Sequence, residues 1–250
     1  MLAAFEFSSV VYLVEPTGAV ARNLLELREG IRQAEPRSLF YHAYEPLLRD
    51  PGADEPPPHD FAHWCEHVLL HPEAAERLEF ASVSSGQGLE SLREALVSVL
   101  DDLCRDDRAR REAPLELGLR LHRWHTLAVR SGLAARDAYE MIECVEALDD
   151  EGFLFHFHEA AEFSTESAGD LVAWLEESGA ERHARVAREV QSSRAGLHAA
   201  RRSLLRRWRQ RSIPARLVAK AGEPEAARRG EARDVMTRLV RGWRRDAEPK

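Results

Sequence analysis

The sequence predicts an all-α, or nearly all-α, protein built from two tandem copies of a small helical unit. Three observations lead to this prediction: one segment occurs twice, most apolar residues recur at helical spacing, and 44% hydrophobic against 31% charged residues is typical of a folded globular chain. A self-similar chain is usually two copies of one buried unit. The 250 residues suffice for two halves of about 100 residues and a tail.

The repeat is clearest between residues 21–42 and 135–156, which align without a gap at a shift of 114 positions. Further along, Asp60 and Trp64 recur as Asp170 and Trp174, at a shift of 110. The shrinking shift indicates short deletions in loops. We therefore predict the following domains: copy 1 over 1–104, a charged linker over 105–113, copy 2 over 114–213, and a basic C-terminal extension over 214–250.

The elements of the first copy follow from its apolar spacing and its turn residues. Residues 5–14 are apolar and β-branched, which fits either a short strand or the start of a helix. Asp60 stands where an N-cap is expected, ahead of an apolar helical face. The remaining elements are expected as a helix over 19–33 that ends near Pro36, a helix or turn over 39–52, a short helix over 72–80, and a leucine-striped helix over 89–103.

The second copy repeats this order, with one difference at its start. Residues 115–129 show no clean counterpart to residues 5–14. We expect a helix over 134–148, a helix capped by Asp170, and one long helix over 181–211 that Pro214 stops. A final amphipathic helix is expected over 226–245.

Charge is distributed unevenly along the chain. Residues 1–180 carry a net charge of −20, whereas residues 181–250 carry +12. A basic end on an acidic body favours assembly, either with itself or with a partner protein, and the alternative is binding to nucleic acid through the C-terminal region. The candidate partner-binding residues are Arg201, Arg202, Arg206, Arg207, Val235, Leu239 and Trp243.

Four histidines at residues 59, 63, 67 and 71 raise the question of a metal site. Two histidines at i and i+4 on one helix can bind the same ion, and only His63 and His67 are well placed for this. The order H-E-x-x-H is absent. We therefore expect a solvated helix face and no metal or other cofactor, with a metal- or small-molecule-dependent activity around His42, Asp60, His63 and His67 as a further alternative.

Both copies carry a histidine after an aromatic segment, His42 and His156, although His158 is an alternative counterpart. A buried imidazole can lock such a segment to a neighbouring helix, whereas an acid–base role would require a nucleophile nearby, and no Ser, Cys or Thr recurs there. We predict structural roles for these histidines and assign no catalytic residue. The repeat-equivalent structural residues are His42, Asp60, Trp64, His156, Asp170 and Trp174.

The three cysteines have no paired spacing, and the chain shows neither a signal-peptide pattern nor a long apolar run. These features predict a cytoplasmic protein without a transmembrane segment.

The segment Leu39-Phe40-Tyr41-His42, followed by Asp60-Phe61-Ala62-His63-Trp64, resembles a bacterial family of unknown function. Members of that family show an aromatic-His segment and then an Asn-Asp-Phe-Ala-x-Trp motif, where this chain has His59 in place of the Asn. The resemblance implies a bacterial protein and transfers no catalytic role. Taken together, the sequence favours a non-catalytic interaction or regulatory protein that acts through protein–protein assembly.

Overall fold

The computed structural model describes residues 3–53, 55–84, 88–163, 170–193 and 195–222. The chain forms two compact units, Met1–Arg206 and Arg207–Lys250. The boundary between these units falls inside the last helix rather than between the two predicted copies. We call residues 1–104 the first half and residues 114–206 the second half, and both belong to the first unit.

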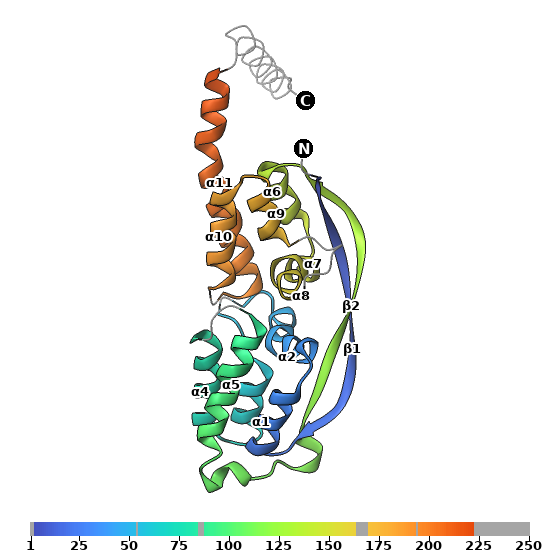
Figure 1. Ribbon diagram of the computed structural model, residues 1–250, viewed down its shortest axis with the longest axis vertical. Helices are drawn as coiled ribbons and strands as arrows, with labels where there is room; N and C mark the ends of the chain where they lie inside the picture. Colours follow the sequence, from blue (N-terminus) through green and yellow to red (C-terminus); the bar gives the residue numbers. More distant parts are fainter. Residues whose placement is uncertain (1–2, 54, 85–87, 164–169, 194, 223–250) are drawn as a thin grey trace, which may run out of the picture. The chain divides into compact units, whose positions relative to one another are not determined.

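The prediction of an all-α protein is wrong, because two long strands pair into an antiparallel two-stranded sheet. Strand β1 spans Phe5–Ala21 and strand β2 spans Leu119–Ala135, each 17 residues long. We call this sheet the ribbon. It runs along one side of the helices of the first unit (Figure 1). The paired residues of the two strands lie 98 to 130 positions apart in sequence, so local periodicity gave little sign of their pairing.

The two strands are counterparts of each other, and the expectation that residues 115–129 have no counterpart in the first copy is wrong. Their burial alternates in nearly the same pattern at a shift of 114. Gly18 and Gly132, also separated by 114, both take a positive φ, +84° and +83°, which glycine adopts without steric penalty. Tyr12 pairs with Thr126, its own counterpart at that shift. The centre of the ribbon is therefore where an axis relating the two halves would pass.

The helices of the first half follow β1 directly. Asn23 caps α1 by accepting a hydrogen bond from the backbone N–H of Glu26, so residues 19–21 belong to the strand. Pro36 begins the next helix instead of only ending the previous one, as its fixed φ allows at a helix start. The helices are α1 (Leu24–Gln33), α2 (Pro36–Arg49), α3 (Asp60–His67), α4 (Pro72–Ser84) and α5 (Leu89–Leu103), followed by the 3₁₀ turns η1 (Asp107–Arg110) and η2 (Leu115–Leu117).

The helices of the second half begin in the same way, with Asp137 capping α6 as Asn23 caps α1. The expected single helix over 181–211 is instead two helices, and the second continues past Pro214. The elements are α6 (Ala138–Ala147), α7 (Asp150–Leu154), the π-helix η3 (Phe155–Glu159), α8 (Ala160–Phe163), α9 (Leu171–Glu177), α10 (Glu181–Gln191) and α11 (Leu197–Gly222).

The core forms where each helix turns its apolar stripe inward. Leu27 and Ile31 of α1 and Leu96 and Leu100 of α5 are fully buried, and these two helices pack against each other. Burying such side chains stabilises the fold by about 1.5–3 kcal/mol each. Among the residues that the structure describes, no helix is long and apolar enough to cross a membrane.

Candidate interaction surface

Each repeated histidine holds the strand of the opposite half. His42 Nε2 accepts a hydrogen bond from the backbone N–H of His122 in β2 at 3.0 Å. His156 Nε2 accepts one from the backbone N–H of Ser8 in β1 at 2.8 Å. Ser8 and His122 are separated by 114 positions, as His42 and His156 are. The side chains of His42 and His156 are each 1% exposed. A ring nitrogen that accepts a backbone N–H carries no proton and is occupied, so it cannot act as a general base.

The strand residues next to these amides are bound in the same crossed manner. Ser9 donates its hydroxyl to the Asp149 carboxylate at 2.6 Å, and Asp149 is the N-cap residue of α7. At the equivalent place Arg123 donates to the carboxylate of Glu35, the N-cap residue of α2, at 2.7 Å. Each strand is thus fastened to the start of a helix in the other half.

The two repeated tryptophans form a third pair of hydrogen bonds between the halves. Trp64 Nε1–H donates to the Leu117 carbonyl at 2.8 Å, and Trp174 Nε1–H donates to the Ala3 carbonyl at 3.0 Å. Leu117 and Ala3 are again separated by 114, and both indole rings are buried. Three kinds of contact therefore recur with the same exchange between halves, which supports the duplication hypothesis.

Asp60 does not cap its helix, contrary to the sequence-based expectation. His59 is the N-cap residue of α3, and its side chain accepts from the Ala62 N–H. Asp60 instead accepts from His42 Nδ1 at 2.9 Å and from Arg49 at 3.2 Å. Burial alone would raise the pKa of Asp60, but the bonds from His42 and Arg49 bring it below its ordinary value. In the second half, Asp170 does act as the N-cap residue of α9.

The two weak metal candidates, His63 and His67, lie on the exposed face of α3 with ring centroids 4.3 Å apart. The Glu66 carboxylate lies 3.9 Å from His67 Nε2. No group of three or more His, Cys, Asp or Glu side chains suited to a metal ion occurs among the described residues.

The arginine candidates on α11 have different environments. Arg201 lies over the Phe153 ring at 4.7 Å, donates to the Asp149 carbonyl at 2.7 Å and pairs with Asp150 at 3.2 Å, so its guanidinium is held by its own chain. Arg202 and Arg206 are exposed, and Arg207 belongs to the second unit. Val235, Leu239 and Trp243 lie outside the described residues, and their role stays a prediction.

The outer face of the ribbon, directed away from the helices, carries a patch of exposed aliphatic side chains. Val11 and Leu13 in β1 are 56% and 50% exposed, and Leu127 and Val129 in β2 are 52% and 64% exposed. Val11 pairs with Leu127, and Leu13 pairs with His125, so these side chains are neighbours across the strands. We call Val11, Leu13, Leu127 and Val129 the ribbon patch. A contiguous exposed apolar patch marks an interaction site more often than scattered apolar residues do.

The rim of the ribbon patch is charged but internally paired. Glu15 accepts hydrogen bonds from His125 and from Arg123, the second at 2.8 Å, and these bonds lower the pKa of Glu15. At the other end Arg130 pairs with Glu6 at 3.3 Å. Since each rim cation has a carboxylate partner, the rim presents little net charge to an approaching surface.

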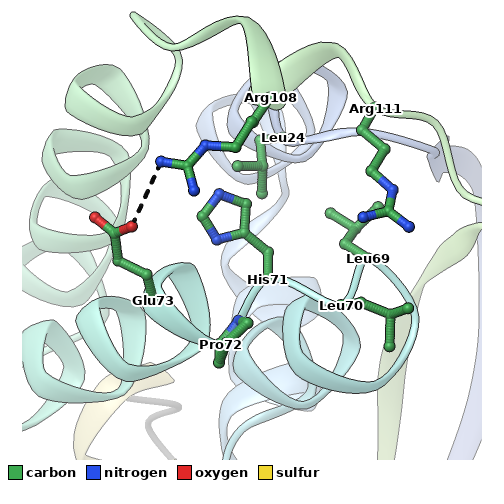
Figure 2. Close-up of a pocket in the computed structure, with 8 residues that line it drawn as sticks. All are labelled: Leu24, Leu69, Leu70, His71, Pro72, Glu73, Arg108 and Arg111. Atoms are coloured by element: carbon green, nitrogen blue, oxygen red, sulfur yellow. Dashed lines mark ion pairs between the residues drawn. The ribbon is translucent and has the colours of Figure 1, made fainter.

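A pocket of about 270 Å³ lies at the start of α4, and Figure 2 shows Arg108 and Arg111 on either side of His71. Arg108 is held by carboxylates, at 2.9 Å from Asp106 and 3.7 Å from Glu73. Its hydrogen bond lowers the pKa of Asp106. Paired in this way, Arg108 gives the pocket little excess positive charge.

Sequence reasoning missed the ribbon patch altogether. Two signals together could have found it. One is the alternation of exposed and inward positions in β1, and the other is the correspondence of residues 5–21 with residues 119–135 at the shift of 114. The clear sequence repeat begins only at residue 21, so it does not reveal that the two strands correspond.

The arrangement defines a mixed helical and β protein in which helices of both halves bind a two-stranded ribbon. The model of a family of unknown function, DUF5752, matches residues 3–208, and the chain belongs to this family. The match covers both halves. No curated protein sequence is significantly similar to this chain. Among solved structures, OrfY from Thermoproteus tenax is similar, with a TM-score of 0.66 and 25% identity, covering 83% of this chain and 95% of that one.

Proposed function

We propose that this protein is a non-catalytic interaction module that associates with a second copy of itself through the ribbon patch. The observation that carries the proposal is the group of four half-exposed aliphatic side chains at the centre of the ribbon. The histidines common to both halves support a non-catalytic role, because their Nε2 atoms are bound to strand amides.

The position of the ribbon patch favours a second copy as its partner. The patch surrounds the Tyr12–Thr126 pair, where an axis relating the halves would pass. A surface on such an axis carries similar side chains on either side of the axis. This suits a twofold dimer, in which the same surface of each copy contacts the other. The net charge of −8 would oppose association of two copies, but the paired rim lessens this repulsion locally.

The expected affinity is modest. Covering a half-exposed Val or Leu contributes roughly 1 kcal/mol, so four side chains on each copy contribute roughly 8 kcal/mol before the entropy of association is subtracted. We therefore expect a dimer whose population depends on protein concentration.

The test is the mass in solution, measured by light scattering and sedimentation over a range of concentrations. The unaltered protein should approach twice the monomer mass as concentration rises, and the Leu13→Glu/Leu127→Glu variant should stay monomeric with an unchanged melting temperature. A matched control, Phe80→Glu/Leu115→Glu, alters two residues that are 70% and 71% exposed outside the patch and should still dimerise. A monomer at every concentration, or equal association of both variants, would overturn the proposal.

A further inference from the structure

A cavity of about 510 Å³ lies where helices of the two halves meet. Its walls come from α2, α3, α4 and α5 of the first half and from η3, α8, α10 and α11 of the second. None of the described residues that line it belongs to β1 or β2, so the cavity is separate from the ribbon patch. Its volume lies within the range of about 300–1,000 Å³ that is common for small-molecule sites.

The wall combines apolar and polar surface and includes the aromatic residues Tyr44, Phe61 and Phe157. Among the residues that the structure describes, its charged side chains are the carboxylates of Glu79 and Glu162, and none of the described Arg or Lys residues lines it. Glu79 lies beside His59, with 3.6 Å between its Oε2 and the ring Nε2. A pocket with acidic groups and aromatic faces attracts a cation, because both the carboxylates and the π-systems favour positive charge.

Glu162 is held in place by one of its oxygens. Its Oε2 accepts a hydrogen bond from the backbone N–H of Leu89, the first residue of α5, at 3.1 Å. Within the described part of the chain, Oε1 accepts no hydrogen bond. A carboxylate fixed through one oxygen can receive a donor from a ligand on the other, and such a charge-assisted bond is stronger than a neutral one.

Two further polar groups face the same space. The rings of Tyr44 and His158 lie 5.1 Å apart, and neither side chain forms a hydrogen bond with the described residues. Burial lowers the pKa of His158 to about 4, so its imidazole is neutral at neutral pH. Burial, and then the Glu162 carboxylate, raise the pKa of Tyr44 to about 12, so its hydroxyl keeps its proton. Both groups can donate to or accept from a ligand without adding positive charge.

The backbone that carries His158 is unusual. Residues Phe155–Glu159 form a turn of π-helix, whereas the equivalent residues 41–45 of the first half lie in the regular helix α2. π-Helical turns are rare and occur often at functional sites. The turn is present in only one of two related halves, so the duplicated scaffold does not require it.

From this geometry we infer that the cavity binds a small organic amine with an apolar or aromatic body, its ammonium group at Glu162 and its apolar part against Tyr44 and Phe157. This site is independent of the self-association proposed above, because it lies among the helices and not on the ribbon. Nothing in the binding step changes a covalent bond.

The experiment compares three probes of the same size, 2-phenylethylamine, 2-phenylethanol and phenylacetate, by titration calorimetry and thermal shift on the full chain at pH 7.5. We expect the amine to bind most tightly, the alcohol about tenfold more weakly, and the anion not measurably. Equal binding of all three, or no binding of the amine, would overturn the inference.

Three variants locate the site. Glu162→Gln keeps the acceptor for Leu89 but removes the charge, so it should weaken amine binding about tenfold and leave the alcohol unchanged. Ala43 corresponds to Phe157 at the shift of 114, and both residues line the cavity. The Ala43→Phe substitution should therefore fill the cavity and block binding of both the amine and the alcohol. The control, Glu94→Gln, removes an exposed charge from α5 and should bind like the unaltered protein. Amine binding that survives Ala43→Phe in a folded protein would place the amine elsewhere and refute the site.

Discussion

The two halves hold the ribbon in the same way but differ at its centre. At the ends, His42 and His156 make matching bonds to the opposite strand, and Trp64 and Trp174 make matching bonds to the segment just before that strand. At the centre, the second half places the carboxylate of Glu159 beneath the ribbon, where it accepts a hydrogen bond from Thr126.

Glu159 is buried and accepts hydrogen bonds from Arg37 at 3.0 Å and from the Thr126 hydroxyl. Its counterpart in the first half, Glu45, pairs instead with Arg49. Burial, and then the Glu159 carboxylate, raise the pKa of the nearby Tyr12. The contacts at the ends of the ribbon are therefore alike in the two halves, whereas those at its centre differ.

The largest expected effect comes from removing the two tryptophans. Trp64→Ala and Trp174→Ala should each lower the free energy of unfolding by about 3–5 kcal/mol, because each leaves a cavity and an unpaired carbonyl. Urea unfolding followed by circular dichroism measures both. Similar losses would strengthen the equivalence of the halves. A loss at one site of less than a quarter of that at the other would refute it, and Phe80→Ala, on an exposed ring, is the control.

A smaller effect is expected at the two histidines. His42→Ala and His156→Ala should each lower the free energy of unfolding by about 1–3 kcal/mol, since each leaves a strand N–H without its acceptor. His42→Ala should be the more damaging because Asp60 also loses a donor. The control His63→Ala changes an exposed ring and should stay within about 0.5 kcal/mol of the unaltered protein. Unchanged melting curves for both buried variants would contradict the structural role.

The smallest effect, specific to the first half, depends on pH. The pKa of Asp60 is lowered in the folded chain, so its stabilising contribution is present above the ordinary aspartate value of 3.8 and is lost as pH falls through the folded-state pKa. Asp60→Asn should therefore lower stability by about 1 kcal/mol at pH 7 and by progressively less as the pH falls below 3.8. Chemical unfolding at a series of pH values tests this. A difference that stays constant down to the lowest pH would show that the carboxylate charge is not involved.

Most of the helices could be located from residue order alone. Asn23 and Asp137 mark the starts of two helices because each caps free backbone N–H groups with its own side chain, a local interaction that residue type predicts. The apolar stripes of α1 and α5 follow likewise from spacing along the chain. Local rules were wrong at Asp60, where a tertiary bond to His42 replaced the expected cap.

The ribbon and its surroundings depend instead on contacts between distant parts of the chain. Each strand satisfies its backbone by pairing with a segment 98 to 130 residues away, so neither is defined by its own neighbours in sequence. The ribbon patch depends on that register, because a slip of one residue in either strand would turn Val11 or Leu127 inward. The cavity around Tyr44 and His158 likewise exists only where helices of both halves meet, since no single segment contains its walls.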